Sequence, residues 1–269
     1  MSSKWKSDFG QYVAEFFGTF VFLTCGLGCV AAVRLADAPL NIWEISMVWG
    51  FAVAMGVYLC AAASGAHMNP SVTIALAIFG CFPKRKIIPY IVVQMVAGFL
   101  AAVLVYVIYQ NLFDLKLAAA GADAAQRVAL AGVFCTFPNP GMSMAQAFLC
   151  ETTATAILLI LIMALTDDGN GLPKGIMAPL LIGFVIALIG GSFGPLTGFA
   201  MNAARDFSPR VFAYLAGWGN DVMTGYPLSA NITIPYFLVP LIAPIVGACL
   251  GSFLYKTMIG KSLECQLDD

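Results

Sequence analysis

Long apolar stretches alternate with short polar connections along almost the whole chain, and this pattern predicts a membrane protein built from helices. A helix needs about 20 mainly apolar residues to cross the hydrocarbon core of a bilayer. The predicted fold class is therefore an all-α integral membrane protein with six transmembrane helices. The predicted spans are 11–33, 42–62, 87–108, 145–166, 175–193 and 234–256.

Two shorter apolar segments, 69–79 and 202–214, cannot cross a bilayer alone. Each follows an irregular stretch, 63–68 or 194–201, and non-helical backbone survives in lipid only where protein buries it or it lines a watery path. Two broken segments at matching positions of two halves are typical of a transport site. We therefore expect two re-entrant half-helices. Three spans in each half require the second half to be inserted upside down, as 3+3 inverted repeats.

The chain is predicted to be a single membrane channel domain, residues 1–269. We assign the first inverted repeat to 1–114, an external connecting loop to 115–144, and the second inverted repeat to 145–256. Residues 257–269 are assigned to a cytoplasmic tail.

The irregular stretches and the starts of the short segments form a near-repeat. In both copies a Gly-containing stretch leads into an Asn, and a short apolar segment follows. Asn is a preferred N-cap, so each Asn is predicted to begin a half-helix. The first copy reads Ser64-Gly65-Ala66-His67-Met68-Asn69-Pro70-Ser71, and the second reads Thr197-Gly198-Phe199-Ala200-Met201-Asn202-Ala203-Ala204.

The two half-helices are predicted to meet end to end near the middle of the membrane. Each N-terminus carries roughly half a positive elementary charge, so a pore between them repels cations. The amides of Asn69 and Asn202 can then donate hydrogen bonds into the pore and interrupt a proton-conducting chain of water molecules. The backbone carbonyls of Gly65–Met68 and Gly198–Met201 line one wall, and the other walls are apolar. This suits water or a small neutral polyol better than an ion.

The composition supports a membrane location. Only 10% of the residues are charged, whereas a soluble domain has about 25%. The net charge of −1 argues against nucleic acid as a partner. Placing both termini in the cytoplasm puts most Lys and Arg residues of the connections on the cytoplasmic side, as the positive-inside rule requires.

Two acidic residues, Glu15 and Glu151, lie near the starts of the first and fourth spans, at matching positions of the two halves. They could relay protons or support the structure. We favour support, because each irregular stretch carries backbone N–H groups that need an acceptor and a carboxylate provides one.

Arg205 lies three residues after Asn202, in the first turn of a half-helix, where a cation opposes the helix dipole. This favours a functional role, in which its N–H groups bind hydroxyls in the pore, over an ion pair with Asp206. His67 is the only histidine. It lacks Cys or carboxylate neighbours suited to a metal, so we expect it to line the pore, and we predict no metal and no cofactor.

Several stretches together resemble the aquaporin family, and within it the aquaglyceroporin branch. The resemblance covers nearly the whole chain. The residues that carry it are Trp43-Glu44-Ile45-Ser46, Ser64-Gly65-Ala66-His67, Ala164-Leu165-Thr166-Asp167-Asp168-Gly169-Asn170-Gly171, Gly194-Pro195-Leu196-Thr197-Gly198-Phe199-Ala200-Met201-Asn202 and Leu215-Ala216-Gly217-Trp218-Gly219-Asn220.

The resemblance implies a narrow constriction formed by Trp49, Phe199 and Arg205. Gly190 matches the position at which water-selective members carry a histidine, so a wider filter is implied. A homotetramer with one pore in each subunit is also implied.

The family's Asn-Pro-Ala signature is altered in both copies. Ser71 replaces the Ala of the first copy, and Ala203 replaces the Pro of the second. Loss of this Pro releases a fixed φ and adds an N–H group without a helical partner. We expect conduction to survive, because packing of the half-helix sets its axis.

These features together predict a passive channel for glycerol and similar small neutral polyols, with some water, and not an enzyme. A water-selective aquaporin is the first alternative. The second is a proton-coupled secondary transporter, for which Glu15, Glu151 and His67 are the candidate titrating groups. The predicted location is the cell membrane, specifically a bacterial inner membrane, as a multi-pass protein in the lipid bilayer with both termini cytoplasmic.

Overall fold

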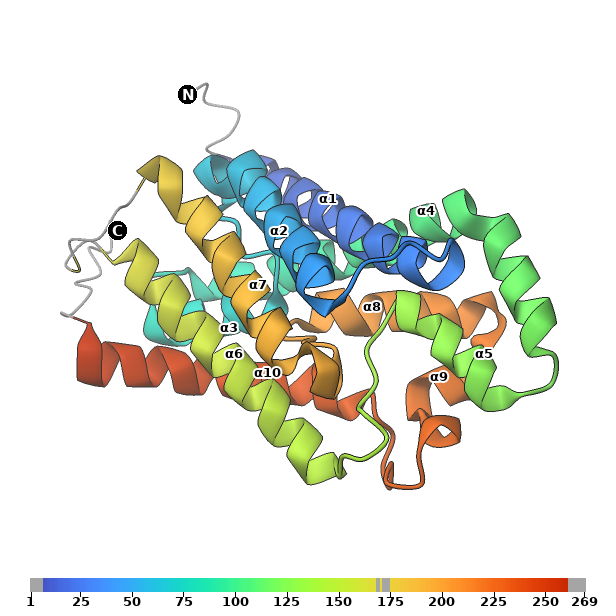
Figure 1. Ribbon diagram of the computed structural model, residues 1–269. Helices are drawn as coiled ribbons and strands as arrows, with labels where there is room; N and C mark the ends of the chain where they lie inside the picture. Colours follow the sequence, from blue (N-terminus) through green and yellow to red (C-terminus); the bar gives the residue numbers. More distant parts are fainter. Residues whose placement is uncertain (1–6, 168–169, 171–174, 261–269) are drawn as a thin grey trace.

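The computed structural model describes residues 7–167, 170 and 175–260. This part of the chain folds into helices, and six of them are long and apolar enough to cross a membrane. The predicted all-α membrane fold is thus confirmed (Figure 1). The six long helices are α1 (Asp8–Leu35), α2 (Ile42–Ser64), α4 (Ile87–Ala120), α6 (Met144–Thr166), α7 (Ala178–Thr197) and α10 (Leu238–Leu254).

Two short helices lie inside this bundle, α3 (Pro70–Phe79) and α8 (Ala203–Ala213). Their bounds agree with the predicted segments 69–79 and 202–214 to within a residue. The packing repeats between the halves: α1 contacts α2 and α4, as α6 contacts α7 and α10, and α3 packs on α10 as α8 packs on α4. Each half-helix therefore lies against the last long helix of the other half.

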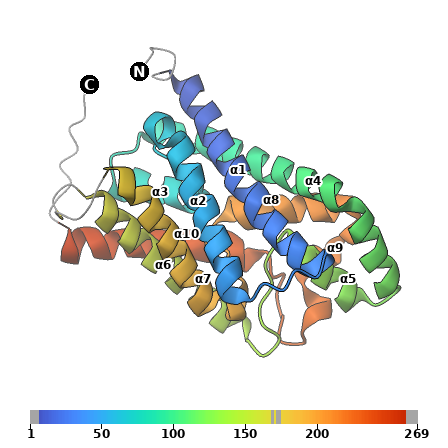
Figure 2. The same cartoon turned by 45° about the horizontal axis from the view of Figure 1, so that its top comes forward.

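Helices α2 and α7 join the two halves and run side by side (Figures 1 and 2). Their backbones approach so closely at Gly50 and Gly183 that a Cβ atom on Gly183 would lie 2.5 Å from the Gly50 carbonyl oxygen. Small residues at helix crossings are the usual way for membrane helices to gain packing contacts, since lipid offers no hydrophobic driving force between them.

Polar contacts place the start of α1, the start of α4, the end of α3 and the end of α10 at one end of the bundle. Lys86 Nζ lies 2.7 Å from the Asp8 carboxylate. Lys256 Nζ donates a 3.0 Å hydrogen bond to the carbonyl oxygen of Phe79, the last residue of α3. A cation at this position also complements the negative end of the half-helix. We call this the terminal end.

Helix α4 runs to Ala120, far beyond the predicted end of its span at 108, and the assigned boundary between 114 and 115 falls inside it. Charged residues end the membrane-crossing part of a helix, but the helix itself continues until Gly121, which has a positive φ. The connection assigned to 115–144 also contains α5 (Ala124–Leu130) and is thus partly helical.

Helix α7 begins and ends later than the predicted 175–193, because it runs from Ala178 through Pro195 to Thr197. Proline removes one helical hydrogen bond, but the helix continues through it for two more residues. Gly198 then adopts a left-handed conformation with φ 77° and ends the helix. The non-helical stretch before α8 is therefore shorter than the predicted 194–201. After α8, a short helix, α9 (Asn220–Thr224), and a loop lead to α10.

Candidate functional site

The two half-helices begin in nearly the same way, although only one of them has a proline. The N-cap Asn69 has φ −158° and ψ 121°, and the N-cap Asn202 has φ −156° and ψ 115°. Asn69 Oδ1 accepts from the Ser71 N–H, and Asn202 Oδ1 accepts from the Ala204 N–H at 2.9 Å. Ala203 in place of Pro therefore leaves the start of α8 unchanged.

The same two asparagines tie the halves together reciprocally. Asn69 Nδ2 donates to the Met201 carbonyl oxygen at 2.8 Å, and Asn202 Nδ2 donates to the Met68 carbonyl oxygen at 2.8 Å. Each amide was predicted to donate into the pore. One of its two N–H groups instead bonds to the opposite loop, which leaves one for a solute and holds that N–H in a defined direction.

The two loops that precede these asparagines have the same unusual backbone. Gly65, Ala66 and Met68 have φ of 83°, 52° and 49°, and Gly198, Phe199 and Met201 have φ of 77°, 41° and 51°. Left-handed conformations at non-glycine residues cost about 1–3 kcal/mol each and persist only where the surroundings hold them. We infer that both loops are strained and need a specific support.

Glu15 and Glu151 occupy the positions at which such support is needed. Both are fully buried. Glu15 accepts hydrogen bonds from the N–H groups of His67 and Met68, and Gln94 Nε2 donates to it at 2.7 Å.

Glu151 makes the equivalent contacts in the second half. Its carboxylate accepts from the N–H groups of Ala200, at 3.0 Å, and Met201, at 2.9 Å, and from the Thr197 hydroxyl at 2.6 Å. Because the N–H groups turn toward the carboxylates, the loop carbonyls are left for the opposite side.

A cavity of about 400 Å³ lies on that side. Most residues of both loops line it, together with Asn69 and Asn202. The predicted site residues that do not line it are Glu15, Glu151, Gly190, Gly198, Pro70, Ser71, Ala203 and Ala204, which lie behind the wall.

Apart from Thr166 and Arg205, the rest of the wall is apolar. These residues were not predicted from the sequence, because α2, α6 and α7 are apolar on every side and periodicity cannot separate a lipid-facing residue from a cavity-facing one. They include Phe22, Val53, Val57, Ala61, Val72, Leu76, Leu158, Ile162, Ile182 and Ile186.

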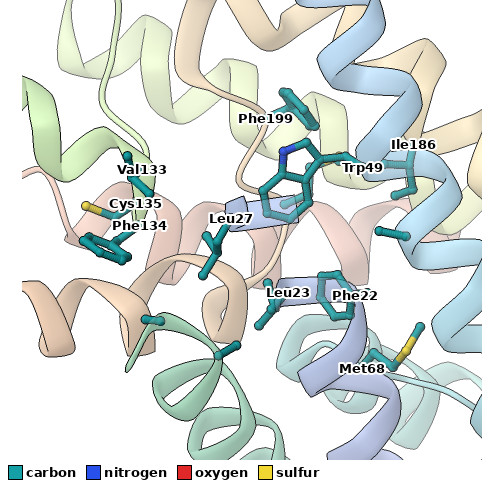
Figure 3. Packing of buried hydrophobic residues seen from close by; sticks show 14 of the residues in the cluster. Phe22, Leu23, Leu27, Trp49, Met68, Val133, Phe134, Cys135, Ile186 and Phe199 are labelled. Carbon is teal, nitrogen blue, oxygen red and sulfur yellow. The ribbon is translucent and has the colours of Figure 1, made fainter. Parts of the chain in front are cut away.

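Trp49, Phe199 and Arg205 come together at one part of the wall. The ring centroids of Trp49 and Phe199 are 6.3 Å apart and nearly perpendicular. The Arg205 guanidinium carbon lies 4.5 Å from the centroid of the Trp49 ring. Figure 3 shows the indole between Phe199 and the Phe22 and Leu27 side chains of α1. The structure thus joins two apolar rings and one cation, as the family resemblance implies.

Arg205 Nη1 is buried and has no hydrogen-bond partner in the described part of the chain. The neighbouring Asp206 instead pairs with Arg210, at 2.9 Å, and accepts from the N–H and hydroxyl groups of Thr136. The alternative of an Arg205–Asp206 ion pair is therefore wrong. A buried donor without a partner is unfavourable, so Arg205 is suited to bind a hydroxyl that enters the cavity.

Gly190 contacts this constriction from behind. A Cβ atom there would lie 2.5 Å from Ser46 Oγ and 3.1 Å from Phe199 Cε2. The space beside Gly190 is therefore filled by the Ser46 side chain and the Phe199 ring and is not open pore.

His67 lines the cavity near the first loop, and its ring is held by neighbours. Nδ1 lies 3.1 Å from Thr73 Oγ1, and the ring centroid lies 4.4 Å from that of Phe82 and 5.2 Å from that of Tyr90.

Known proteins share both the sequence and the architecture. The sequence pattern of the family described as "Major intrinsic protein" matches residues 1–255. The chain belongs to this family. The aquaporin resemblance predicted from the sequence is thereby confirmed.

Individual relatives in the major intrinsic protein family are close. The glycerol uptake facilitator protein of Escherichia coli (strain K12) is 56% identical over 260 residues, which cover 96% of this chain and 91% of the relative. The propanediol uptake facilitator PduF of Citrobacter freundii is 51% identical over 257 residues, covering 95% and 94%. The X-ray structure of the aquaglyceroporin from Plasmodium falciparum superimposes with a TM-score of 0.81 at 30% identity, covering 94% and 97%.

Replacing Glu151 by Gln tests the support of the second loop. The amide nitrogen of Gln cannot accept, so at least one of the three donors around Glu151 loses its partner, at about 1–3 kcal/mol. We expect a lower Tm in detergent and a lower solute permeability per channel in proteoliposomes. Glu44→Gln is the control, because Glu44 is exposed and Gln can preserve its capping box. Equal behaviour of the two variants would contradict the assigned support.

Proline substitutions at adjacent positions test the start of α8. Ala203→Pro restores the family signature at the first helical position, where Pro fits, and we expect solute permeability within about twofold of the unmodified chain because the Asn202 geometry already matches that of Asn69. Ala204→Pro removes one of the two N–H groups that bond Asn202 Oδ1, the other being that of Arg205, and should lower permeability severalfold. Stopped-flow permeability at equal membrane abundance measures both. A severalfold gain in solute permeability with Ala203→Pro would show that Ala203 leaves the axis of α8 incorrectly oriented, and would contradict this prediction.

Proposed function

We propose that this chain is a passive membrane channel that conducts glycerol and other small neutral polyols, together with some water, and that it is not an enzyme. The observation that carries the proposal is the constriction, where two aromatic rings face a buried guanidinium with an unpartnered Nη1. A polyol has an apolar carbon edge and a hydroxyl edge, which match the rings and the arginine respectively. The names of the relatives, a glycerol and a propanediol uptake facilitator, support the same substrate class.

The same geometry accounts for exclusion of ions. Two half-helix N-termini and Arg205 make the middle of the path electropositive, which repels cations. An anion would have to leave its hydration shell in this path, and apolar walls and carbonyl oxygens around a single Arg205 do not replace that shell. Each contact with the solute is a single hydrogen bond or an apolar contact, so binding stays weak enough for the solute to leave.

A proton-coupled mechanism is less well supported than a passive one. Coupling needs a titrating group that is exposed alternately to the two sides. Glu15 and Glu151 are buried behind the loops and already accept several hydrogen bonds, and neither lines the cavity. Their contacts support a structural role for each glutamate, which is to hold the loop of its own half in place.

The setting of the channel is part of the proposal. We propose a bacterial inner membrane, with the terminal end of the bundle in the cytoplasm, because Lys84, Arg85, Lys86 and Lys256 gather there as the positive-inside rule requires. We also propose a homotetramer with one pore in each subunit, by analogy within the family.

Stopped-flow light scattering on proteoliposomes tests the function. We expect glycerol gradients to relax much faster than in empty vesicles, with a low activation energy and no effect of a protonophore. Fast water movement without glycerol entry would favour the water-selective alternative, and loss of uptake on adding the protonophore would favour the coupled transporter.

Gly190→His tests how the constriction selects polyols over water. An imidazole at this position must displace both the Ser46 side chain and the Phe199 ring, because the Cβ atom alone would lie 2.5 Å from Ser46 Oγ and 3.1 Å from Phe199 Cε2. We expect glycerol permeability to fall at least about tenfold while water permeability changes by less than about twofold, since narrowing a pore excludes the wider solute first. Water flux in the same vesicles is the internal control. An unchanged ratio would remove Gly190 from the constriction.

A further inference from the structure

Trp49, the largest ring of the constriction, rests on a residue that lies outside the cavity. Gly26 is a buried residue of α1 and does not line the cavity. A Cβ atom on Gly26 would lie 2.5 Å from Trp49 Cε3, 2.5 Å from Cζ3 and 2.6 Å from Cη2. These three atoms belong to the six-membered ring of the indole. Real Cβ contacts are essentially never shorter than 3.0 Å, so only glycine permits the observed position of Trp49.

We propose that Gly26 is a specificity-determining residue of this channel, which sets the aperture by letting the Trp49 indole lie back against the α1 backbone. The proposal rests on the proposed polyol-channel function. Gly26 touches no solute and acts through Trp49 alone.

The packing decides which group would move if Gly26 were larger. Helix α1 is held between α2 and α4, and its neighbouring Leu23 and Leu27 side chains are completely buried. Leu23 also packs closely against α4. Its Cδ1 would lie only 3.1 Å from a Cβ atom placed on Gly98, so α4 leaves no free space beside it. Close packing of this kind leaves a helix little room to retreat.

The indole, in contrast, lines the cavity on its other side. The Arg205 guanidinium carbon lies 4.5 Å from the ring centroid, in cation–π contact, and is the polar group at the same part of the cavity wall. An added methyl group at Gly26 would therefore push the indole toward Arg205 and Phe199. Ordinary contact begins near 3.4 Å, so the ring must shift by about an ångström, a large change for a pore that selects by width.

Gly26→Ala tests this directly, with Gly28→Ala as the matched control. Both changes replace a glycine in α1 and bring the same gain in helix propensity, but a Cβ atom on Gly28 would meet nothing within 4 Å. In proteoliposomes at equal channel density, we expect Gly26→Ala to lower glycerol permeability at least about tenfold and water permeability by less than about twofold, because width selects the larger solute. Gly28→Ala should match the unmodified channel for both solutes.

A double variant separates the proposed role from a general packing defect. Trp49→Leu removes the indole, so adding Gly26→Ala to it should change the glycerol-to-water ratio no further, whereas independent effects would multiply. If Gly26→Ala alone fails to accumulate in the membrane, the double variant should accumulate, because the clash is gone.

Three results would overturn the proposal: an unchanged ratio in Gly26→Ala, an equal loss in Gly28→Ala, or the same fold-loss from Gly26→Ala with and without Trp49. Failure of the double variant to accumulate would also overturn it. The unmodified channel is measured first. If it passes water but no glycerol, the proposed function is refuted, and the Gly26 variants are not needed to show it.

Discussion

The structure depends on satisfying irregular backbone in the middle of a membrane. Two loops with left-handed residues lie there, and their buried N–H groups need acceptors that the protein supplies. Glu15 and Glu151 accept those N–H groups in the first and second halves respectively. Burying a carboxylate is itself unfavourable unless it is well hydrogen-bonded. The loop N–H groups stabilise the buried carboxylate, and the carboxylate in turn holds the loop in its left-handed conformation. This pairing keeps each loop at the cavity wall.

Every other feature of the path follows from that arrangement. Since the N–H groups point to the carboxylates, the loop carbonyls are left for the opposite side, where residues of both loops line the cavity. Each loop ends in an N-cap asparagine, which also bonds the carbonyl of the opposite loop. The half-helix starts are thus locked to each other. Arg205, three residues beyond Asn202, is carried to its place beside Trp49.

The Arg210–Asp206 ion pair of α8 explains why the Arg205 guanidinium remains available for a ligand. Arg210 and Asp206 are both completely buried, and they satisfy each other and the backbone oxygens of Thr136 and Val222. The acidic residue nearest to Arg205 in sequence is therefore already occupied. As a result, the guanidinium of Arg205 keeps an Nη1 group without a protein partner, which a solute hydroxyl can use.

The sequence by itself determined the spans, the two half-helices, the paired asparagines and the paired glutamates, because helix length, capping chemistry and polar residues in apolar surroundings are local signals. The sequence did not determine where every helix ends: α4 runs on to Ala120, since hydropathy reports membrane depth and not helix length. Only the tertiary structure decided which partner each polar group takes, such as Asp206 with Arg210 and not Arg205. It also decided which apolar residues line the cavity and where Gly26 lies behind Trp49. These are contacts between distant segments of uniformly apolar helices, and a pattern along one chain cannot specify which faces meet.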